Sequence, residues 1–389
     1  MPNKRERADR LCLGLCAALT LALCLRWQRV FYLMCADYIL SDMPAHIRLA
    51  LGHNDYSLAS WIVRALWRLL GEARGQTALS LVLTANQALG IAALWLLLRR
   101  MFPAVGRGGA LAAALAAHLC GPWIVPGQTG MYLWGYNGNV LHNMTLLFSR
   151  SLVPLDLLFF FRLWDARRGR FSAADWLGFA LCLLGTTLFK PSFLGAFAPA
   201  VFLLLVWDFA KTRCRGFGRE FVIGLAVLPA LAALVWSSTV LYAEDFAGTR
   251  SGVALRVLTL PALLSLLLLY LRGLLLPVWS FALQGPREEK RGQLSIVALT
   301  LLIAILEALL LTETGFRAND GNFEWGSLTL YPTVFGLAAA LLWRMLARAE
   351  TRAARARAAV GAALLLGHLL VGAYCLWRPG HAGYEWFYF

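Results

Sequence analysis

Apolar runs of near-membrane length constrain this chain more than any other feature. A helix needs about 20 predominantly apolar residues to cross the hydrocarbon core of a bilayer. Because 60% of the 389 residues are hydrophobic and only 15% are charged, a soluble domain could not bury this much apolar surface. The sequence predicts an all-α polytopic membrane protein with about eleven transmembrane helices, forming a single transmembrane domain over residues 1–389. The runs fall at roughly 11–34, 77–98, 108–126, 144–164, 174–189, 192–209, 220–241, 256–284, 293–312, 326–346 and 358–377.

The formal net charge of +15 comes from short basic clusters between these runs, which is not the pattern of a nucleic-acid-binding surface. Basic residues accumulate on the cytoplasmic side of membrane proteins. If eleven spans are right, the clusters share one side, which puts the N-terminus in the cytoplasm and the C-terminus outside. We therefore predict a multi-pass membrane protein with this orientation. The clusters are Lys4/Arg5/Arg7/Arg10, Arg99/Arg100/Arg107, Arg167/Arg168/Arg170, Lys211/Arg213/Arg215/Arg219, Arg287/Lys290/Arg291 and Arg344/Arg348/Arg352/Arg355/Arg357.

The segments predicted to be external carry most of the chemically versatile side chains. The cytoplasmic loops are short and basic, and no phosphate-binding glycine loop occurs. The longest external loop, 36–76, predicts two short helices, one from about Ser41 to Leu51 and one after Ser57. The second is amphipathic and suited to the membrane interface. Its apolar positions are Leu58, Trp61, Ile62, Ala65, Leu66 and Leu69.

Asp42 and His46 lie one helical turn apart in this loop and are the candidate catalytic pair. A carboxylate there can accept a proton from an attacking hydroxyl, and an imidazole can tune or relay the charge. The alternative is that Asp42 caps its helix. Ser41 is able to supply that cap instead.

Two further external segments predict contacts to a sugar or an acceptor. Amides, aromatic rings and glycines permit close approach and paired hydrogen bonds to a sugar ring. The alternatives are an interfacial aromatic belt followed by Asn143 as a helix cap, and a solvated turn at Asp320-Gly321. The candidates are Gln128, Tyr132, Tyr136, Asn137, Asn139, His142 and Asn143, followed by Asp320, Asn322 and Glu324.

Arg150 and Lys190 are the candidate lipid-phosphate ligands, because each lies at the external end of a predicted span. Snorkelling to lipid headgroups is the alternative for both. Lys190-Pro191-Ser192 is expected to form a tight turn between two spans. Asp156 and Glu307 fall inside apolar runs, where each charge needs a partner or a cavity. A basic residue on another helix is the expected partner of Asp156.

A carboxylate and two short helices in the loop after the first span resemble the GT-C class of polyprenyl-phosphate-sugar-dependent glycosyltransferases. Residues 138–145 also resemble a Pro-Asn-x-x-His-Asn-Pro-Thr pattern of uncharacterised bacterial polytopic proteins of this kind, with Gly138 and Met144 in place of the prolines. The segments 190–193 and 321–326 resemble further motifs of the same group.

This resemblance implies that Asp42 is the base that activates an acceptor hydroxyl, with inversion at the anomeric carbon, and that Lys190 or Arg150 stabilises the departing phosphate. The implied donor is a sugar on a polyprenyl phosphate or diphosphate, and the acceptor is an envelope glycan, lipid or protein on the external face. Membrane lipids are expected partners and nucleic acid is not. No metal or other cofactor is predicted, because the first loop lacks an Asp-x-Asp pair.

Two other functions fit the same sequence. A transporter or flippase of a lipid-linked saccharide would use Asp156 and Glu307 as intramembrane switches. Such proteins are often built from internal repeats, and no convincing repeat is found here. A polysaccharide polymerase or ligase would use a lipid diphosphate donor.

Overall fold

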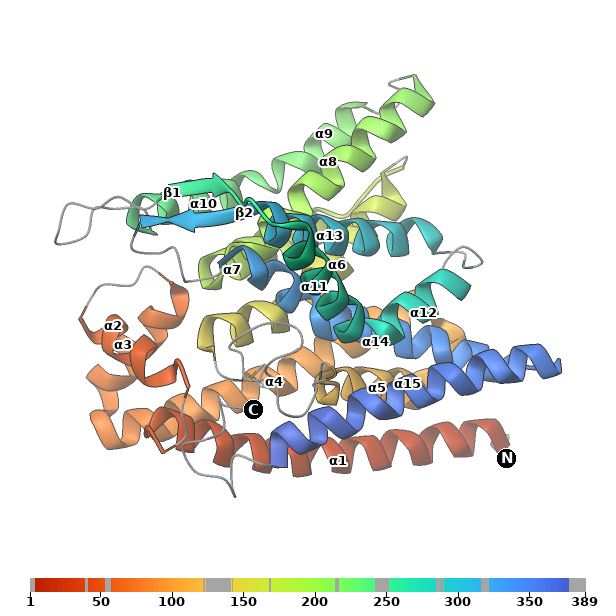
Figure 1. Ribbon diagram of the computed structural model, residues 1–389, viewed down its shortest axis with the longest axis horizontal. Helices are drawn as coiled ribbons and strands as arrows, with labels where there is room; N and C mark the ends of the chain where they lie inside the picture. Colours follow the sequence, from red (N-terminus) through yellow and green to blue (C-terminus); the bar gives the residue numbers. More distant parts are fainter. Residues whose placement is uncertain are drawn as a thin grey trace.

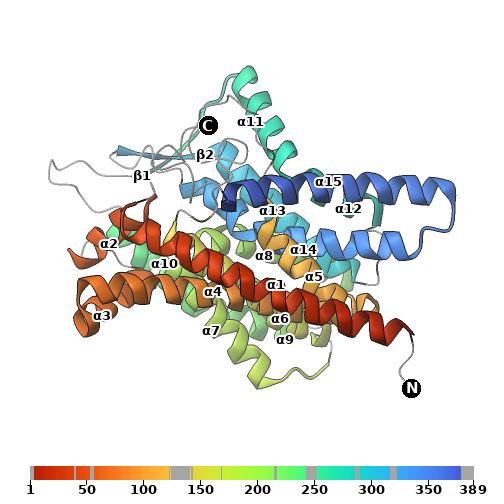
Figure 2. The same ribbon diagram turned by 90° about the horizontal axis from the view of Figure 1, so that it is seen from below.

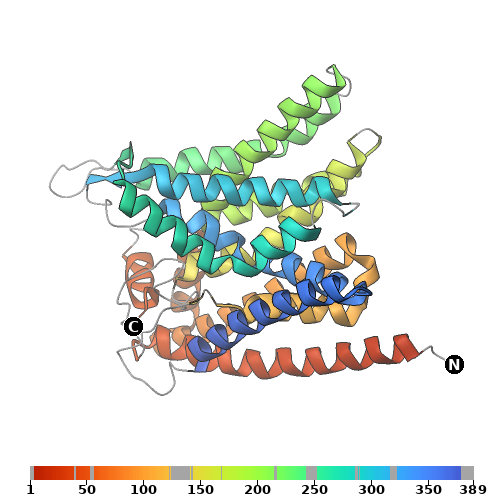
Figure 3. The ribbon, with the colours of Figure 1, turned by 45° about the vertical axis from the view of Figure 1, so that its right-hand side comes forward.

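The computed structural model describes residues 4–38, 41–52, 57–121, 123, 141, 143–167, 169–213, 217–241, 252–284, 288, 290–315 and 322–377. Within these ranges the chain forms a bundle of long helices (Figures 1 and 3). The helices are α1 (Lys4–Cys35), α2 (Met43–Leu51), α3 (Leu58–Leu70), α4 (Glu72–Met101), η1 (Pro103–Val105), α5 (Gly106–Leu119), α6 (Met144–Ala166), α7 (Ala173–Phe189), α8 (Ser192–Thr212), α9 (Phe217–Leu225), α10 (Leu228–Leu241), α11 (Leu260–Gly273), α12 (Leu275–Gln284), α13 (Arg291–Leu310), η4 (Asn322–Glu324), α14 (Trp325–Ala347) and α15 (Arg352–Trp377).

The prediction of an all-α polytopic membrane protein is confirmed. Among the described helices, seven are long and apolar enough to cross a membrane, and the number rises to nine if each of two bent pairs is one span. Helix α7 is apolar but shorter, at 17 residues. Helices α6 and α14 are buried along most of their length and form the core of the bundle. The count of eleven spans remains a prediction.

Two of the predicted spans are bent. The run at 256–284 breaks between α11 and α12, which meet at 73° directly after Gly273. Helices α9 and α10 meet at 41°, a bend that the uninterrupted apolar run at 220–241 did not predict.

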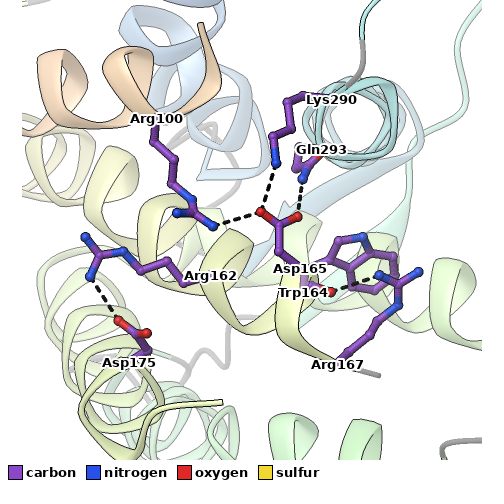
Figure 4. Close-up of polar contacts among 8 residues, drawn as sticks. All are labelled: Arg100, Arg162, Trp164, Asp165, Arg167, Asp175, Lys290 and Gln293. Carbon is purple, nitrogen blue, oxygen red and sulfur yellow. Dashed lines mark hydrogen bonds and ion pairs between the residues drawn. The ribbon is translucent and has the colours of Figure 1, made fainter. Parts of the chain in front are cut away.

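Ion pairs between helix ends hold members of several basic clusters together at one end of the bundle, which we call the basic end. Asp165, at the end of α6, lies 2.8 Å from Arg100 of α4 and 3.0 Å from Lys290 at the start of α13 (Figure 4). The first turns of α1 also lie here, since the Asp9 carboxylate accepts a hydrogen bond from the Gly108 amide at 2.8 Å. The assignment of this end to the cytoplasm remains a prediction.

The opposite end of the bundle carries α2 and α3, and we call it the α2/α3 end (Figures 1 and 2). Both predicted short helices are confirmed. The apolar face of α3 is only partly exposed: Trp61 is 44% and Leu69 80% exposed, whereas Leu58, Ile62 and Leu66 pack against the core. On its other face, Arg64 donates a hydrogen bond to the Ala50 carbonyl at the end of α2, at 3.1 Å.

A short antiparallel pair of strands, β1 (Gly252–Leu255) and β2 (Leu311–Thr314), also lies at this end (Figure 1). The apolar runs predict helix from about 256 onward and up to about 312, and both boundaries are corrected. Pro261 stands in the first turn of α11, where its missing N–H is not needed, and Thr259 before that turn has extended backbone, so α11 begins only at Leu260. The preceding segment is free to pair with β2, and the Arg256 amide donates to the Leu310 carbonyl at 2.7 Å.

Candidate active site

The first turn of α2 presents Asp42 without using its side chain as a helix cap. Asp42 occupies the cap position, yet its carboxylate accepts no capping hydrogen bond. The hydroxyl of Ser41 accepts instead from the Met43 amide, at 3.2 Å. Pro44, inside the first turn, lacks the N–H that such a turn leaves unsatisfied. The helix-cap interpretation of the Asp42 carboxylate is therefore wrong.

Asn143 joins the predicted catalytic pair to the first turn of α6. Its side-chain oxygen accepts a hydrogen bond from the Leu146 amide at 3.0 Å, which makes it the cap of α6. Its nitrogen lies 3.3 Å from Oδ2 of Asp42 and 3.2 Å from Nε2 of His46. Asn143 is buried, whereas Asp42 and His46 are half-buried. Three predicted site residues, about 100 positions apart in the sequence, thus meet in the structure. Asn143 makes this contact and also caps α6, as the alternative interpretation predicted.

Lys190 lies in the tight turn between α7 and α8, as predicted, and it is only 8% exposed. Its ammonium sits 4.5 Å from the centre of the Trp325 ring, a cation–π contact at the start of α14. The preceding residue, Phe189, stacks on Phe148 of α6 with ring centres 4.6 Å apart. This stack places the Lys190 turn against the first two turns of the helix that Asn143 caps.

Arg150 lies two turns below Asn143 on α6 and is 2% exposed. Its guanidinium donates to the side-chain oxygen of Gln87 on α4, at 2.8 Å. The snorkelling interpretation of Arg150 is therefore wrong. The neighbouring Asn86 donates to the Leu147 carbonyl at 2.8 Å, so α4 and α6 share a polar contact inside the bundle. Sequence analysis missed Asn86 and Gln87, although two adjacent amides inside an apolar run were a usable signal.

A second cluster of polar side chains lies around the start of α14. The Asn322 amide donates to Oε2 of Glu313 at 2.7 Å, and Glu313 is buried. Glu324 lies 3.4 Å from the guanidinium of Arg256. Arg256 and Glu313 were not among the predicted site residues, because only the unpredicted pairing of β1 with β2 brings them to this position.

Several predicted site residues lie outside the described residues: Gln128, Tyr132, Tyr136, Asn137, Asn139, His142 and Asp320. Within the described ranges, no group of three or more His, Cys, Asp and Glu side chains is arranged to hold a metal ion.

The two intramembrane carboxylates have different surroundings. The hydroxyl of Thr186 on α7 donates to Asp156 at 2.7 Å, and Asp156 is fully buried. The basic partner expected for Asp156 is not found among the described residues, so that prediction is corrected. Glu307 is half-buried on α13 and lies beside Gly195 of α8, where a methyl group added to the glycine would come within 3.4 Å of its carboxylate.

Comparison with known proteins shows similarity in fold without detectable similarity in sequence. No protein-family description matches the chain, and no curated protein matches its sequence. Two solved structures match over 94% of this chain at 14% identity: ArnT from Cupriavidus metallidurans bound to undecaprenyl phosphate and the same protein in the apo state. The TM-scores are 0.52 and 0.50, over 77% and 72% of the ArnT chains. The chain has the fold of ArnT, a GT-C glycosyltransferase, as the sequence resemblance to that class predicted.

Proposed function

We propose that this protein is an integral-membrane glycosyltransferase that moves a sugar from a polyprenyl-phosphate-linked donor to an envelope glycan, lipid or protein acceptor. The reaction would take place at the α2/α3 end, on the external face of a bacterial inner membrane. Two observations support this proposal. The fold is that of ArnT, and a carboxylate, an imidazole and an amide converge at one end of the bundle.

Asp42 is the proposed catalytic base. As the acceptor oxygen bonds to the anomeric carbon, the bond from that carbon to the phosphate oxygen breaks and its electron pair stays with the phosphate. The proton of the acceptor hydroxyl passes to the Asp42 carboxylate. Attack opposite the leaving group inverts the anomeric configuration.

Lys190 is the proposed ligand of the departing phosphate. Its ammonium is held on the Trp325 ring in a largely water-excluded position, where a positive charge stabilises developing negative charge more than it does in water. Arg150, deeper on α6, is already bonded to Gln87. It would contribute to phosphate binding through its charge or by a rearrangement of that contact.

His46 and Asn143 are proposed to position the Asp42 carboxylate. The observation that carries the proposal is the double contact of the Asn143 nitrogen, at 3.3 Å to Asp42 and 3.2 Å to His46. Because Asn143 also caps α6, the orientation of the base is tied to a buried helix of the bundle, which is how a preorganised site is held. Asn322 and Glu324 are proposed to contact the sugar or the acceptor. The same role is proposed for the segments around Asn137 and Asp320.

Replacing Asp42 with asparagine tests the assignment directly. The purified chain is incubated with a panel of undecaprenyl-phosphate sugars and envelope extract, and release of undecaprenyl phosphate is followed by mass spectrometry. We expect Asp42→Asn to slow release about 10²- to 10⁴-fold, since a general base is lost, while undecaprenyl phosphate binding is retained. Asp175→Asn, whose carboxylate pairs with Arg162 at the basic end, is the matched control and should keep full activity. An unchanged rate for Asp42→Asn would remove Asp42 from the mechanism.

The same experiment separates transfer from transport. In a transporter of a lipid-linked saccharide, the intramembrane carboxylates would be required and Asp42 would not. Loss of function in Asp156→Asn and Glu307→Gln, together with full function in Asp42→Asn, would make transport the better account.

A further inference from the structure

A pocket of about 800 Å³ opens at the basic end, between the ends of α6 and α8 and the start of α13. It lies at the opposite end of the bundle from Asp42 and plays no part in the proposed transfer. Cationic and aromatic side chains dominate its lining. They are Trp164, Arg167, Trp207, Lys211 and Arg291.

The acidic residues of this pocket already have basic partners. Asp165 accepts contacts from Arg100, Lys290 and Gln293 (Figure 4). Asp208 lies 3.5 Å from Arg167, which is also 3.9 Å from Glu220. Lys211 and Arg291 differ from these cations. Within the part of the chain that the structure describes, neither makes a side-chain hydrogen bond or ion pair, so both charges remain available to a ligand.

The aromatic residues give the pocket an apolar side. Trp207 is 69% exposed and lies one helical turn before Lys211, on the same face of α8. Leu203, one turn earlier on the same face, is 52% exposed as well, so this face of α8 is expected to lie against lipid. Trp164 stacks under the Arg167 guanidinium, 4.2 Å from the ring centre. Tryptophan beside lysine and arginine is the combination that membrane proteins present to lipid headgroups.

We propose that this pocket binds the phosphate of an anionic phospholipid from the leaflet at the basic end. Lys211 and Arg291 hold the phosphate, and Trp207 packs against the glycerol and upper acyl chain. A zwitterionic lipid is disfavoured, because its own ammonium would compete for the phosphate with these two cations. A free phosphate would gain nothing from the exposed Trp207. The inference does not depend on the proposed transferase activity.

Native mass spectrometry of the full chain in detergent tests the site, with dioleoyl phosphatidylglycerol and dioleoyl phosphatidylcholine as probes. We expect tighter binding of phosphatidylglycerol, and a loss of about ten- to thirtyfold in the double variant Lys211→Gln/Arg291→Gln, since each cation near an anionic lipid contributes about one factor of five. The matched control is Arg352→Gln/Arg355→Gln on α15, which removes the same charge at the same end and should bind as the unmodified chain does.

Three outcomes would overturn the proposal. Equal losses in the two double variants would mean that charge alone, and not this pocket, attracts the lipid. Equal binding of the two lipids to the unmodified chain would exclude anion selectivity. Displacement of phosphatidylglycerol by millimolar inorganic phosphate would identify a free-phosphate site instead. Thermal unfolding of each variant, compared with the unmodified chain, separates a binding defect from a folding defect.

Discussion

The two ends of the bundle use charged side chains in different ways. At the basic end, Asp165 meets Arg100 and Lys290, cations from two other helices. At the α2/α3 end, neutral groups are among the contacts of the charged side chains. The Asn143 amide contacts Asp42, the Trp325 ring contacts Lys190, and Arg256 forms an ion pair with Glu324.

The contrast separates a structural use of charge from a chemical one. Half-exposed ion pairs between helix ends contribute about 0–1 kcal/mol each to the free energy of unfolding. Their main effect is therefore to determine which helix ends lie together. An aromatic ring stabilises an ammonium group without neutralising its charge. These contacts are the basis on which group transfer is proposed at the α2/α3 end.

The sharpest test of this contrast compares one lysine from each end. Lys190→Gln should lower kcat about 10²-fold, because stabilisation of the departing phosphate is lost. Lys190→Arg should retain more activity, since the charge is kept. Lys290→Gln, which loses only its contact to Asp165, should leave kcat unchanged. Equal rates for Lys190→Gln and Lys290→Gln would contradict a chemical role for Lys190 and a structural role for Lys290.

A smaller effect is expected when the bridging amide is changed. Asn143→Ser keeps a side-chain oxygen for the α6 cap but removes the nitrogen that contacts Asp42, so transfer should fall about tenfold with little loss of stability. Asn143→Ala should match that loss and also destabilise the protein by about 1 kcal/mol. Initial rates and thermal unfolding in detergent measure the two effects.

The control for that series comes from the other end. Ser172 caps α7 at the basic end, where its hydroxyl accepts from the Ala174 amide. Ser172→Ala should therefore cost about 1 kcal/mol of stability without any change in transfer. A tenfold drop in its rate would show that loss of any helix cap, and not the Asp42 contact, slows the reaction.

The smallest effect is predicted for Asp165→Asn. This change removes the charge that Arg100 and Lys290 share, yet both contacts are about one-third exposed, so the free energy of unfolding should fall by less than about 1 kcal/mol. Transfer should stay within about twofold of the unmodified chain. A larger loss of activity would mean that the basic end takes part in the reaction.

Hydropathy was enough to predict most of the fold. The runs at 144–164 and 174–189 correspond closely to α6 and α7, because a membrane span must be apolar over its whole length. The strands β1 and β2 were not predicted. Each has four residues, and the pairing of Val253 with Glu313 joins positions far apart in the chain, so no local period marks it.

The site was predicted only in part, for the same reason. A spacing of four residues on a short helix was enough to group Asp42 with His46. Nothing local showed that Asn143 would meet them, since that contact depends on how α2 packs beside α6. The partner of Arg150 was similarly hidden, because Gln87 belongs to another helix.

The bridging amide also determines where hydrogen atoms lie. The Asn143 oxygen is committed to the α6 cap, so its two N–H groups are left for Asp42 and His46. Nε2 of His46 must then accept with its lone pair, which assigns the neutral ring's proton to Nδ1. A second proton on Nε2 would set donor against donor and separate His46 from Asn143. The contact therefore selects one tautomer of His46, and the same amide that selects it also caps α6.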